Sequence, residues 1–174
     1  LPQTCYFVGS HPLAGSEKKG VQNADADLFE NSTCIVTPTR ITNRYACERV
    51  RKLWMKLGAR VKNLSAEEHD KILSYTSHIP HVLAYSLMEV VPSNCFDYVG
   101  QGLKDTTRIA SSTPQLWSDI CMGNSKNIIK GIDEIVKSLS NVRRCVMTKD
   151  QKGLTNQFEK AKKKRDGLSK CQRI

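Results

Sequence analysis

The segment at residues 32–65, STCIVTPTRITNRYACERVRKLWMKLGARVKNLS, predicts a strand, a helix and a second strand in succession. The two ends, residues 32–39 and 60–65, are short runs with the pattern of strands. Between them, apolar residues recur at helical spacing over residues 42–57. Because a strand, a helix and a strand in this order form a parallel sheet covered by helices, the segment predicts an α/β fold.

Both ends of this helix, and the start of the next one, carry capping signals. Thr42 or Asn43 is suited to cap the first helix, and Gly58 is placed to end it. Ser65 and Glu68 have the spacing of a capping box, which predicts that a new helix begins directly after the second strand.

The chain beyond Ser65 is predicted to be helical, whereas the segment before residue 32 adds one more strand, at residues 5–10. Helices are expected over the ranges 65–91, 113–123, 124–146 and 152–170, with a loop at residues 96–112. One stripe of apolar residues lies on the third of these helices: Ile128, Ile132, Ile135, Leu139 and Val142. The stripe fits either an intramolecular core or a dimer seam, because periodicity alone does not separate the two.

Two or three strands cannot form a covered parallel sheet by themselves. The chain also begins at Leu1, close to a strand and without an initiator methionine, so we expect it to be part of a larger protein. The predicted organisation is therefore an α/β remnant over residues 1–64 followed by an all-α domain over residues 65–174.

The composition is that of a globular protein with an unusual net charge of +10. Much of this excess lies in the C-terminal tail, without interleaved aromatic residues, so nucleic-acid binding is not expected. The seven cysteines include no C-x-x-C pair, which disfavours a zinc ribbon and fits reduced thiols in the cytoplasm. No apolar run is long enough to predict a membrane span, and no secretory signal is recognisable.

The first candidate for chemistry is His11, which follows the predicted strand at residues 5–10. A neutral imidazole is suited to accept a proton near neutral pH, and α/β folds bind ligands at the ends of parallel strands. Pro12 biases His11 toward an extended backbone, and Glu17 supplies a carboxylate on the following loop. The alternative is a strand-end histidine that makes one structural hydrogen bond.

The second candidate is a polar stripe on the helix predicted at residues 65–91, in which Pro80 predicts a kink. Its members recur at intervals of three or four residues: Ser74, Ser77, His78, His81 and Tyr85. Such a stripe is costly to bury unless it meets a ligand or a network of partners, so substrate contact and a satisfied structural pair both remain open. A metal site is not expected, because the H-E-x-x-H pattern is absent and no third ligand is evident.

The third candidate lies in the loop expected at residues 96–112, which contains Lys104, Asp105 and Arg108. An arginine offers a rigid fork to a carboxylate or phosphate, although a solvated surface is the plainer interpretation. The sequence contains no G-x-G-x-x-G loop, no phosphate-binding G-x-x-x-x-G-K-[ST] loop and no G-x-S-x-G elbow, so spacing alone names no reaction.

Three blocks of the sequence together resemble the prephenate/arogenate dehydrogenase family of tyrosine biosynthesis. They are FVGSHPLAGSEKKGV at residues 7–21, SHIPHVLAYSL at residues 77–87 and GQGLKDTTRIASSTPQLWSDI at residues 100–120. The blocks occur in the family's order and at roughly its spacing. This resemblance implies an NAD(P)-dependent oxidative decarboxylation, in which prephenate would give 4-hydroxyphenylpyruvate, CO2 and reduced cofactor.

The resemblance also implies roles for individual residues. His11, in the H-P-x-A-G motif, would be the catalytic base that accepts the proton of the ring hydroxyl, and Arg108 would bind a substrate carboxylate. The full set of implied substrate contacts is Ser77, His78, His81, Lys104 and Arg108. Glu17 and Asp105 would form an ionic gate over the pocket, and Trp117 would approach the site of the neighbouring subunit.

By the same resemblance, residues 1–64 would be the last strands and one helix of a Rossmann-like nucleotide-binding domain. Residues 65–174 would be a helical domain that binds substrate and forms a homodimer. The cofactor would be NAD or NADP, and the glycine-rich loop that binds it would lie upstream of Leu1. Arogenate as the substrate, and a non-catalytic dimerisation module that binds tyrosine, are the alternatives, with tyrosine also a candidate inhibitor.

Overall fold

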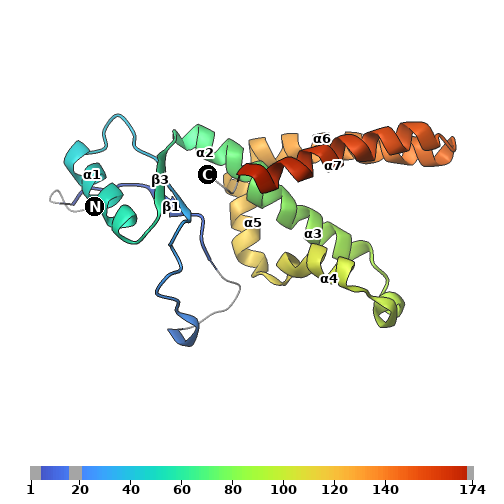
Figure 1. Cartoon of the computed structure of the whole chain (residues 1–174), viewed down its shortest axis with the longest axis horizontal. Coiled ribbons are helices and arrows are strands. Elements are labelled where there is room, and N and C mark those ends of the chain that lie inside the picture. The colour runs from blue at the N-terminus through green and yellow to red at the C-terminus, as the bar shows by residue number, and fades with distance from the viewer. Residues whose placement is uncertain (1–4, 16–20, 172–174) are drawn as a thin grey trace. The chain divides into compact units, whose positions relative to one another are not determined.

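The computed structural model describes residues 5–15 and 21–171, which form two compact units, Leu1–Ile128 and Ile129–Ile174 (Figure 1). The first unit combines a small sheet with helices, and the second is helical. The structure thus confirms the predicted fold class, an α/β remnant followed by helices. The predicted domain boundary after Leu64 falls inside the first unit and stays a prediction.

The sheet has three strands in the order β1 (Ser10–Pro12), β2 (Thr33–Val36) and β3 (Arg60–Asn63). β2 and β3 are parallel, and α1 (Arg44–Lys56) connects them, as the strand–helix–strand pattern predicts. Three of the four residues of β2 are buried, so this central strand forms the core of the sheet.

The first strand differs from its prediction in position and in direction. Residues 5–9 are not in a strand, and β1 pairs antiparallel with β2, with His11 opposite Ile35. Tyr6 and Phe7 leave 64% and 72% of their surface exposed, so the apolar run that indicated a buried strand is not buried in this chain. The strand predicted at residues 5–10 is therefore wrong, and His11 lies within an outer strand of the described sheet rather than at the end of a parallel one.

The ends of α1 follow the local signals in the sequence. Asn43 is the N-cap residue, and its Oδ1 accepts a hydrogen bond from the Ala46 amide at 2.9 Å. Gly58 follows the helix with a φ of +82°, and a Cβ built on it would lie 3.0 Å from Cγ of Glu30. Both the left-handed backbone and the close approach of Glu30 therefore require glycine at this position.

The helix predicted at residues 65–91 is present, but it has three parts. These are α2 (Ala66–Leu73), a π-helical turn η2 (Ser74–His78) and α3 (Ile79–Val90). The predicted capping box forms at the start of α2, where the Ser65 and Glu68 side chains each accept the other residue's backbone amide.

The π-helical turn lies directly before Pro80. Proline has no amide hydrogen for the bond that an α-helix would make to Thr76, and the amide of Ile79 bonds instead to the carbonyl of Ser74, five residues earlier. The predicted kink therefore takes the form of a widened turn, which changes the spacing of the polar residues along the helix.

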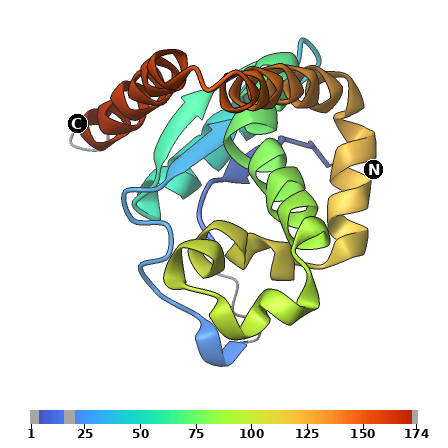
Figure 2. The same ribbon diagram turned by 90° about the vertical axis from the view of Figure 1, so that its right-hand side faces the viewer.

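Residues 96–112 are mostly helical, contrary to the predicted loop. The elements are η3 (Ser93–Tyr98), α4 (Gln101–Thr107) and η4 (Arg108–Ser111). The two glycines that indicated a loop stand at the start of α4, where they interrupt no helix interior. α4 and η4 pack against α3, as Figure 2 shows. This tertiary contact stabilises two short helices that the local sequence does not predict.

The remaining helices are close to their predicted ranges: α5 (Pro114–Gly123), α6 (Ser125–Met147) and α7 (Gln151–Cys171). A short 3₁₀ turn, η1 (Val21–Asn23), lies between β1 and β2. The apolar stripe on α6 is partly covered, since Ile128 is buried whereas Leu139 is 59% exposed. In the described part of the chain, no helix is both long and apolar enough to cross a membrane.

Candidate active site

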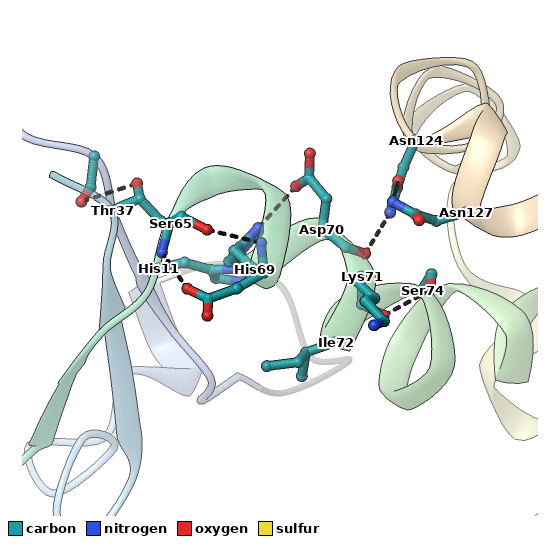
Figure 3. Close-up of polar contacts among 12 residues, drawn as sticks. His11, Thr37, Ser65, His69, Asp70, Lys71, Ile72, Ser74, Asn124 and Asn127 are labelled. Carbon is teal, nitrogen blue, oxygen red and sulfur yellow. Dashed lines mark hydrogen bonds and ion pairs between the residues drawn. The ribbon is translucent and has the colours of Figure 1, made fainter. Parts of the chain in front are cut away.

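His11 is bonded to a second histidine, His69 on α2, which the sequence analysis did not single out. Nδ1 of His11 lies 2.9 Å from Nε2 of His69, and the two ring centroids are 5.2 Å apart (Figure 3). β1 fixes His11 at the outer edge of the sheet. Only two residues separate the end of β3 from the start of α2, so the first turns of α2 lie close to this part of the sheet.

His69 is in turn bonded to its neighbour Asp70. Nδ1 of His69 lies 2.9 Å from Oδ1 of Asp70, a contact drawn in Figure 3. An ionised carboxylate only accepts hydrogen bonds, so His69 carries a proton on Nδ1; in the neutral His69 ring, Nε2 then accepts the Nδ1 proton of His11. Nε2 of His11 therefore keeps its lone pair, and the three residues together present a base.

A hollow of about 410 Å³ adjoins the His11 ring. It is lined by residues 7–10, His11, Thr37, Ala66, His69 and Asp70. Burial, and then the nearby His69, lowers the pKa of His11 below its ordinary value of 6.5. His11 is thus neutral at pH 7, and its Nε2 is suited to accept a proton from a molecule bound in the hollow.

His78 and His81 lie on η2 and α3, against Trp117 of α5. The His81 ring stacks on the indole with centroids 3.4 Å apart and planes at 19°, and His78 meets the same indole edge-on at 6.2 Å. Nδ1 of His81 lies 2.9 Å from the carbonyl oxygen of Ser77 and donates to it. Burial lowers the pKa of both histidines, so both rings are neutral near pH 7.

The predicted polar stripe on this helix is only partly available to a ligand. Ser74 is fully buried, and the Tyr85 hydroxyl donates to the carbonyl of Ser112 at 2.7 Å. The other three members, Ser77, His78 and His81, are half-buried. A mainly apolar hollow of about 260 Å³ lies beside this face, with a lining that includes His81, Tyr85, Pro114, Trp117 and Cys121.

Lys104, Asp105 and Arg108 stand on α4 and η4, the elements that pack against α3. Lys104 and Arg108 are exposed, and the Asp105 carboxylate accepts a hydrogen bond from Nε2 of Gln101 at 2.7 Å. Glu17, the other half of the predicted gate, lies outside the described residues, so the gate stays a prediction. Within the described ranges, no three His, Cys, Asp or Glu side chains are grouped to hold a metal ion.

Sequence reasoning missed His69 and Asp70, which lie 58 and 59 positions after His11. One usable signal was available. Both residues fall in the first two turns of the helix that starts directly after the second predicted strand, and this position alone indicates that they lie near the sheet that carries His11.

Two family models match the chain and together span most of it. The nucleotide-binding domain of prephenate dehydrogenase matches residues 1–63, and the dimerization domain of prephenate dehydrogenase matches residues 65–160. The second match by itself covers more than half of the chain.

Curated proteins similar to this chain carry related names. The prephenate dehydrogenase of Bacillus subtilis (strain 168) is 39% identical over 97% of this chain and 47% of its own length. The cyclohexadienyl dehydrogenase of Zymomonas mobilis is 34% identical over 93% of this chain and 58% of its own length. The chain thus spans about half the length of the curated relatives it matches.

Solved structures give the same picture of the fold. The prephenate dehydrogenase of Aquifex aeolicus, solved in complex with hydroxyphenyl propionate and NAD+, aligns with a TM-score of 0.84 and 34% identity. That alignment covers 93% of this chain and 59% of the Aquifex chain. The arogenate dehydrogenase of Synechocystis shares the fold, with a TM-score of 0.79 at 21% identity.

Proposed function

The chain belongs to the prephenate dehydrogenase family, and on that premise we propose that the protein converts prephenate to 4-hydroxyphenylpyruvate and CO2 with NAD or NADP. The observation that carries the proposal is the bonded series Asp70–His69–His11, which leaves Nε2 of His11 as an acceptor beside a hollow. An oxidation of a ring alcohol needs such an acceptor for the hydroxyl proton.

Proton transfer is the step assigned to this chain's residues. Nε2 of His11 takes the ring hydroxyl proton as the C–O bond becomes a carbonyl and a hydride leaves the same carbon. The bond to the ring carboxylate then breaks, its electrons complete the aromatic ring, and CO2 departs. His11 returns its proton to the phenolate oxygen. While His11 is protonated, the Asp70 carboxylate stabilises its charge through His69.

Binding of the substrate's two carboxylates is assigned to the cations on α4 and η4. Lys104 and Arg108 are exposed and stand on elements that pack against α3, the helix that bears His81. A guanidinium pairs with a carboxylate through two parallel hydrogen bonds, so Arg108 is the stronger anchor and Lys104 its support. Ser77, His78 and His81 contact the substrate in this proposal, and Asp105 with Glu17 gates its entry.

The residues present fit one end of the nicotinamide cofactor. The hollow of about 410 Å³ has the size of small-molecule sites, and residues 7–10 with His11 would hold the nicotinamide ring there. The sequence has no G-x-G-x-x-G fingerprint, so these residues do not fit the pyrophosphate. When bound, the cofactor supplies the hydride acceptor.

The same proposal includes the organisation of the protein. The two family matches meet between residues 63 and 65, which supports domains at residues 1–64 and 65–174. The apolar stripe of α6 is partly exposed, with 59% of the Leu139 surface accessible, which supports a homodimer through the helical domain. In this dimer, Trp117 approaches the site of the neighbouring subunit. Tyrosine as an inhibitor and a cytoplasmic location complete the proposal. Cytoplasmic thiols are reduced, and Cys5, Cys34, Cys47, Cys95, Cys121 and Cys145 are free thiols.

The test of the proposed function is the His11→Asn variant of the complete protein. Asparagine can still donate to Nε2 of His69, but it cannot accept the hydroxyl proton. Turnover of prephenate, followed as formation of reduced cofactor, should fall by ~10²- to 10⁴-fold. The Lys126→Ala variant, a change at the start of α6, should retain wild-type turnover. If turnover of the His11→Asn enzyme stays within a few-fold of wild type, His11 is not the catalytic base.

Arogenate is the alternative substrate, and it differs from prephenate by an amine in place of a keto group. The similarity to an arogenate dehydrogenase, at 21% identity, supports the shared fold alone. Measuring kcat/KM for both acids with the same preparation decides between them, and we expect the value for prephenate to be higher.

A further inference from the structure

A buried asparagine, Asn124, connects the helix start of α6 to the histidine pair on η2 and α3. It is 8% exposed and lies between α5 and α6. Its Nδ2 lies 2.7 Å from the carbonyl oxygen of Asp70 and 3.2 Å from Nδ1 of His78. Its Oδ1 accepts a hydrogen bond from Nδ2 of Asn127 at 2.8 Å (Figure 3).

These partners fix the orientation of the Asn124 amide. A backbone carbonyl can only accept a hydrogen bond, so the group that faces Asp70 must be the NH₂ group. The same NH₂ group has one hydrogen left, and it points to Nδ1 of His78. Nδ1 of His78 must therefore be the acceptor, and the proton of the neutral ring must lie on Nε2.

The other three histidines of the chain have the opposite arrangement. Nδ1 of His69 faces the Asp70 carboxylate, Nδ1 of His81 faces the Ser77 carbonyl, and Nδ1 of His11 faces the lone pair of His69. Each of these rings carries its proton on Nδ1. His78 is thus the one histidine among four whose partner is a donor, and Asn124 is that partner.

We propose that Asn124 is a positioning residue that holds His78 in the Nε2–H form, so that His78 serves the site as a hydrogen-bond donor while His11 serves as an acceptor. The role of His78 toward substrate rests on the proposed function, whereas its protonation pattern does not. A donor at Nε2 is suited to an oxygen of the substrate, either a carboxylate or a keto group, and not to an ammonium group.

Asp70 connects the two arrangements. Its carboxylate orients His69 and through it His11, while its backbone carbonyl fixes the amide that orients His78. One residue of α2 therefore supports both the acceptor and the donor.

The charged and titratable groups around His78 favour the neutral ring that this arrangement needs. Burial is the largest effect and lowers the pKa of His78; His69, His81 and His11 lower it further, and Asp70 raises it. Protonation of Nδ1 would also place two N–H groups against each other at the 3.2 Å contact with Asn124.

Nitrogen-15 NMR of the imidazole rings tests the proposal directly, since the chain has four histidines. Of the four histidines of this chain, we expect three rings protonated on Nδ1 and one, His78, protonated on Nε2 in the wild-type protein at pH 7.5. A His78→Gln variant assigns the signal. Finding His78 protonated on Nδ1 in the wild-type protein overturns the proposal. This test does not depend on whether any variant of Asn124 folds.

The Asn124→Asp variant should reverse the protonation pattern of His78. A carboxylate at this position accepts where the amide donates, so His78 should move its proton to Nδ1, and its pKa should rise above the wild-type value. Asn127→Ser is the matched control, because it removes the bond to Oδ1 and leaves both donations of Asn124 in place; here His78 should stay protonated on Nε2. An Asn124→Asp protein that folds and keeps the wild-type pattern contradicts the proposal.

Kinetics of the complete protein then separate this inference from the proposed function. Asn124→Asp should raise KM for prephenate by about tenfold, with a smaller change in kcat, because a substrate contact and not the base is altered. A protein that shows the expected ring signals but turns over neither prephenate nor arogenate would leave the positioning role intact and refute the proposed reaction. Unchanged KM together with reversed His78 signals would refute the role of His78 toward substrate.

Discussion

The hydrogen bond between Asp70 and His69 gives the sharpest prediction for the chemistry of this site. The Asp70→Asn substitution keeps an acceptor at Oδ1 but removes the negative charge that faces Nδ1 of His69 at 2.9 Å. When His11 accepts a proton, the positive charge on the two bonded rings then has no carboxylate to stabilise it. The substitution should therefore slow the proton-transfer step more than it weakens substrate binding.

The magnitude follows from the exposure of the pair. A hydrogen bond to a charged group contributes about 1.5–3 kcal/mol when it is well shielded. Here 48% of the Asp70 side chain and 20% of the His69 side chain are exposed to solvent. Solvent screening reduces the contribution to about 1–2 kcal/mol. At about 1.36 kcal/mol for each tenfold change in rate, kcat should fall about 5- to 30-fold.

The assay is the initial rate of cofactor reduction by the complete protein with saturating prephenate at pH 7.5. Glu67→Gln is the matched control, because it removes an exposed negative charge from the first turn of α2, one turn before Asp70. Its kcat should stay within twofold of wild type. The reasoning is refuted if Asp70→Asn also stays within twofold, or if the control loses as much activity, since a general loss of negative charge would then explain the effect.

Two further predictions concern stability. The pKa values of His11, His78 and His81 lie below 6.5 in the folded chain, so the unfolded state binds more protons as the pH falls below about 6.5. The free energy of unfolding should therefore decrease from pH 7.5 to pH 5.5, by at most about 1.4 kcal/mol per pH unit for each histidine. Urea denaturation at the two pH values measures this change, and a higher stability at pH 5.5 would contradict the prediction. Gly58→Ala should lower stability by about 1–3 kcal/mol, because it forces a side chain into a φ of +82° and to within 3.0 Å of Glu30. Gly123→Ala, where the added Cβ meets no atom within 4 Å, should be neutral or stabilising, and equal Tm losses in the two variants would contradict this account.

The features that could be predicted from the sequence depend on neighbouring residues. Asn43 caps α1 through the amide three residues ahead, and Ser65 and Glu68 form their box across the same interval. Gly58 ends α1 because of its own backbone angle. Such contacts close within one turn of chain, so residue type and spacing are enough to identify them.

The predictions that were wrong concern elements whose structure depends on contacts with distant segments of the chain. Residues 5–9 have the composition of a buried strand, but pairing begins only at Ser10 and runs antiparallel to β2. α4 and η4 have glycines typical of a loop, but their packing against α3 stabilises helix. Neither the direction of a strand nor the contact that supports a short helix is encoded in local spacing.

The sequence by itself determined the strand–helix–strand unit, the helical remainder and, through three motifs, the family to which the chain belongs. It also placed His11, His78 and His81 among the candidates. The tertiary structure decided what each ring can do: His69 and Asp70 leave His11 an acceptor, and Asn124 leaves His78 a donor. The physical reason is that the proton position on an imidazole is set by the atoms that face its two nitrogens. For His11 and His78, those atoms come from residues 58 and 46 positions away along the chain.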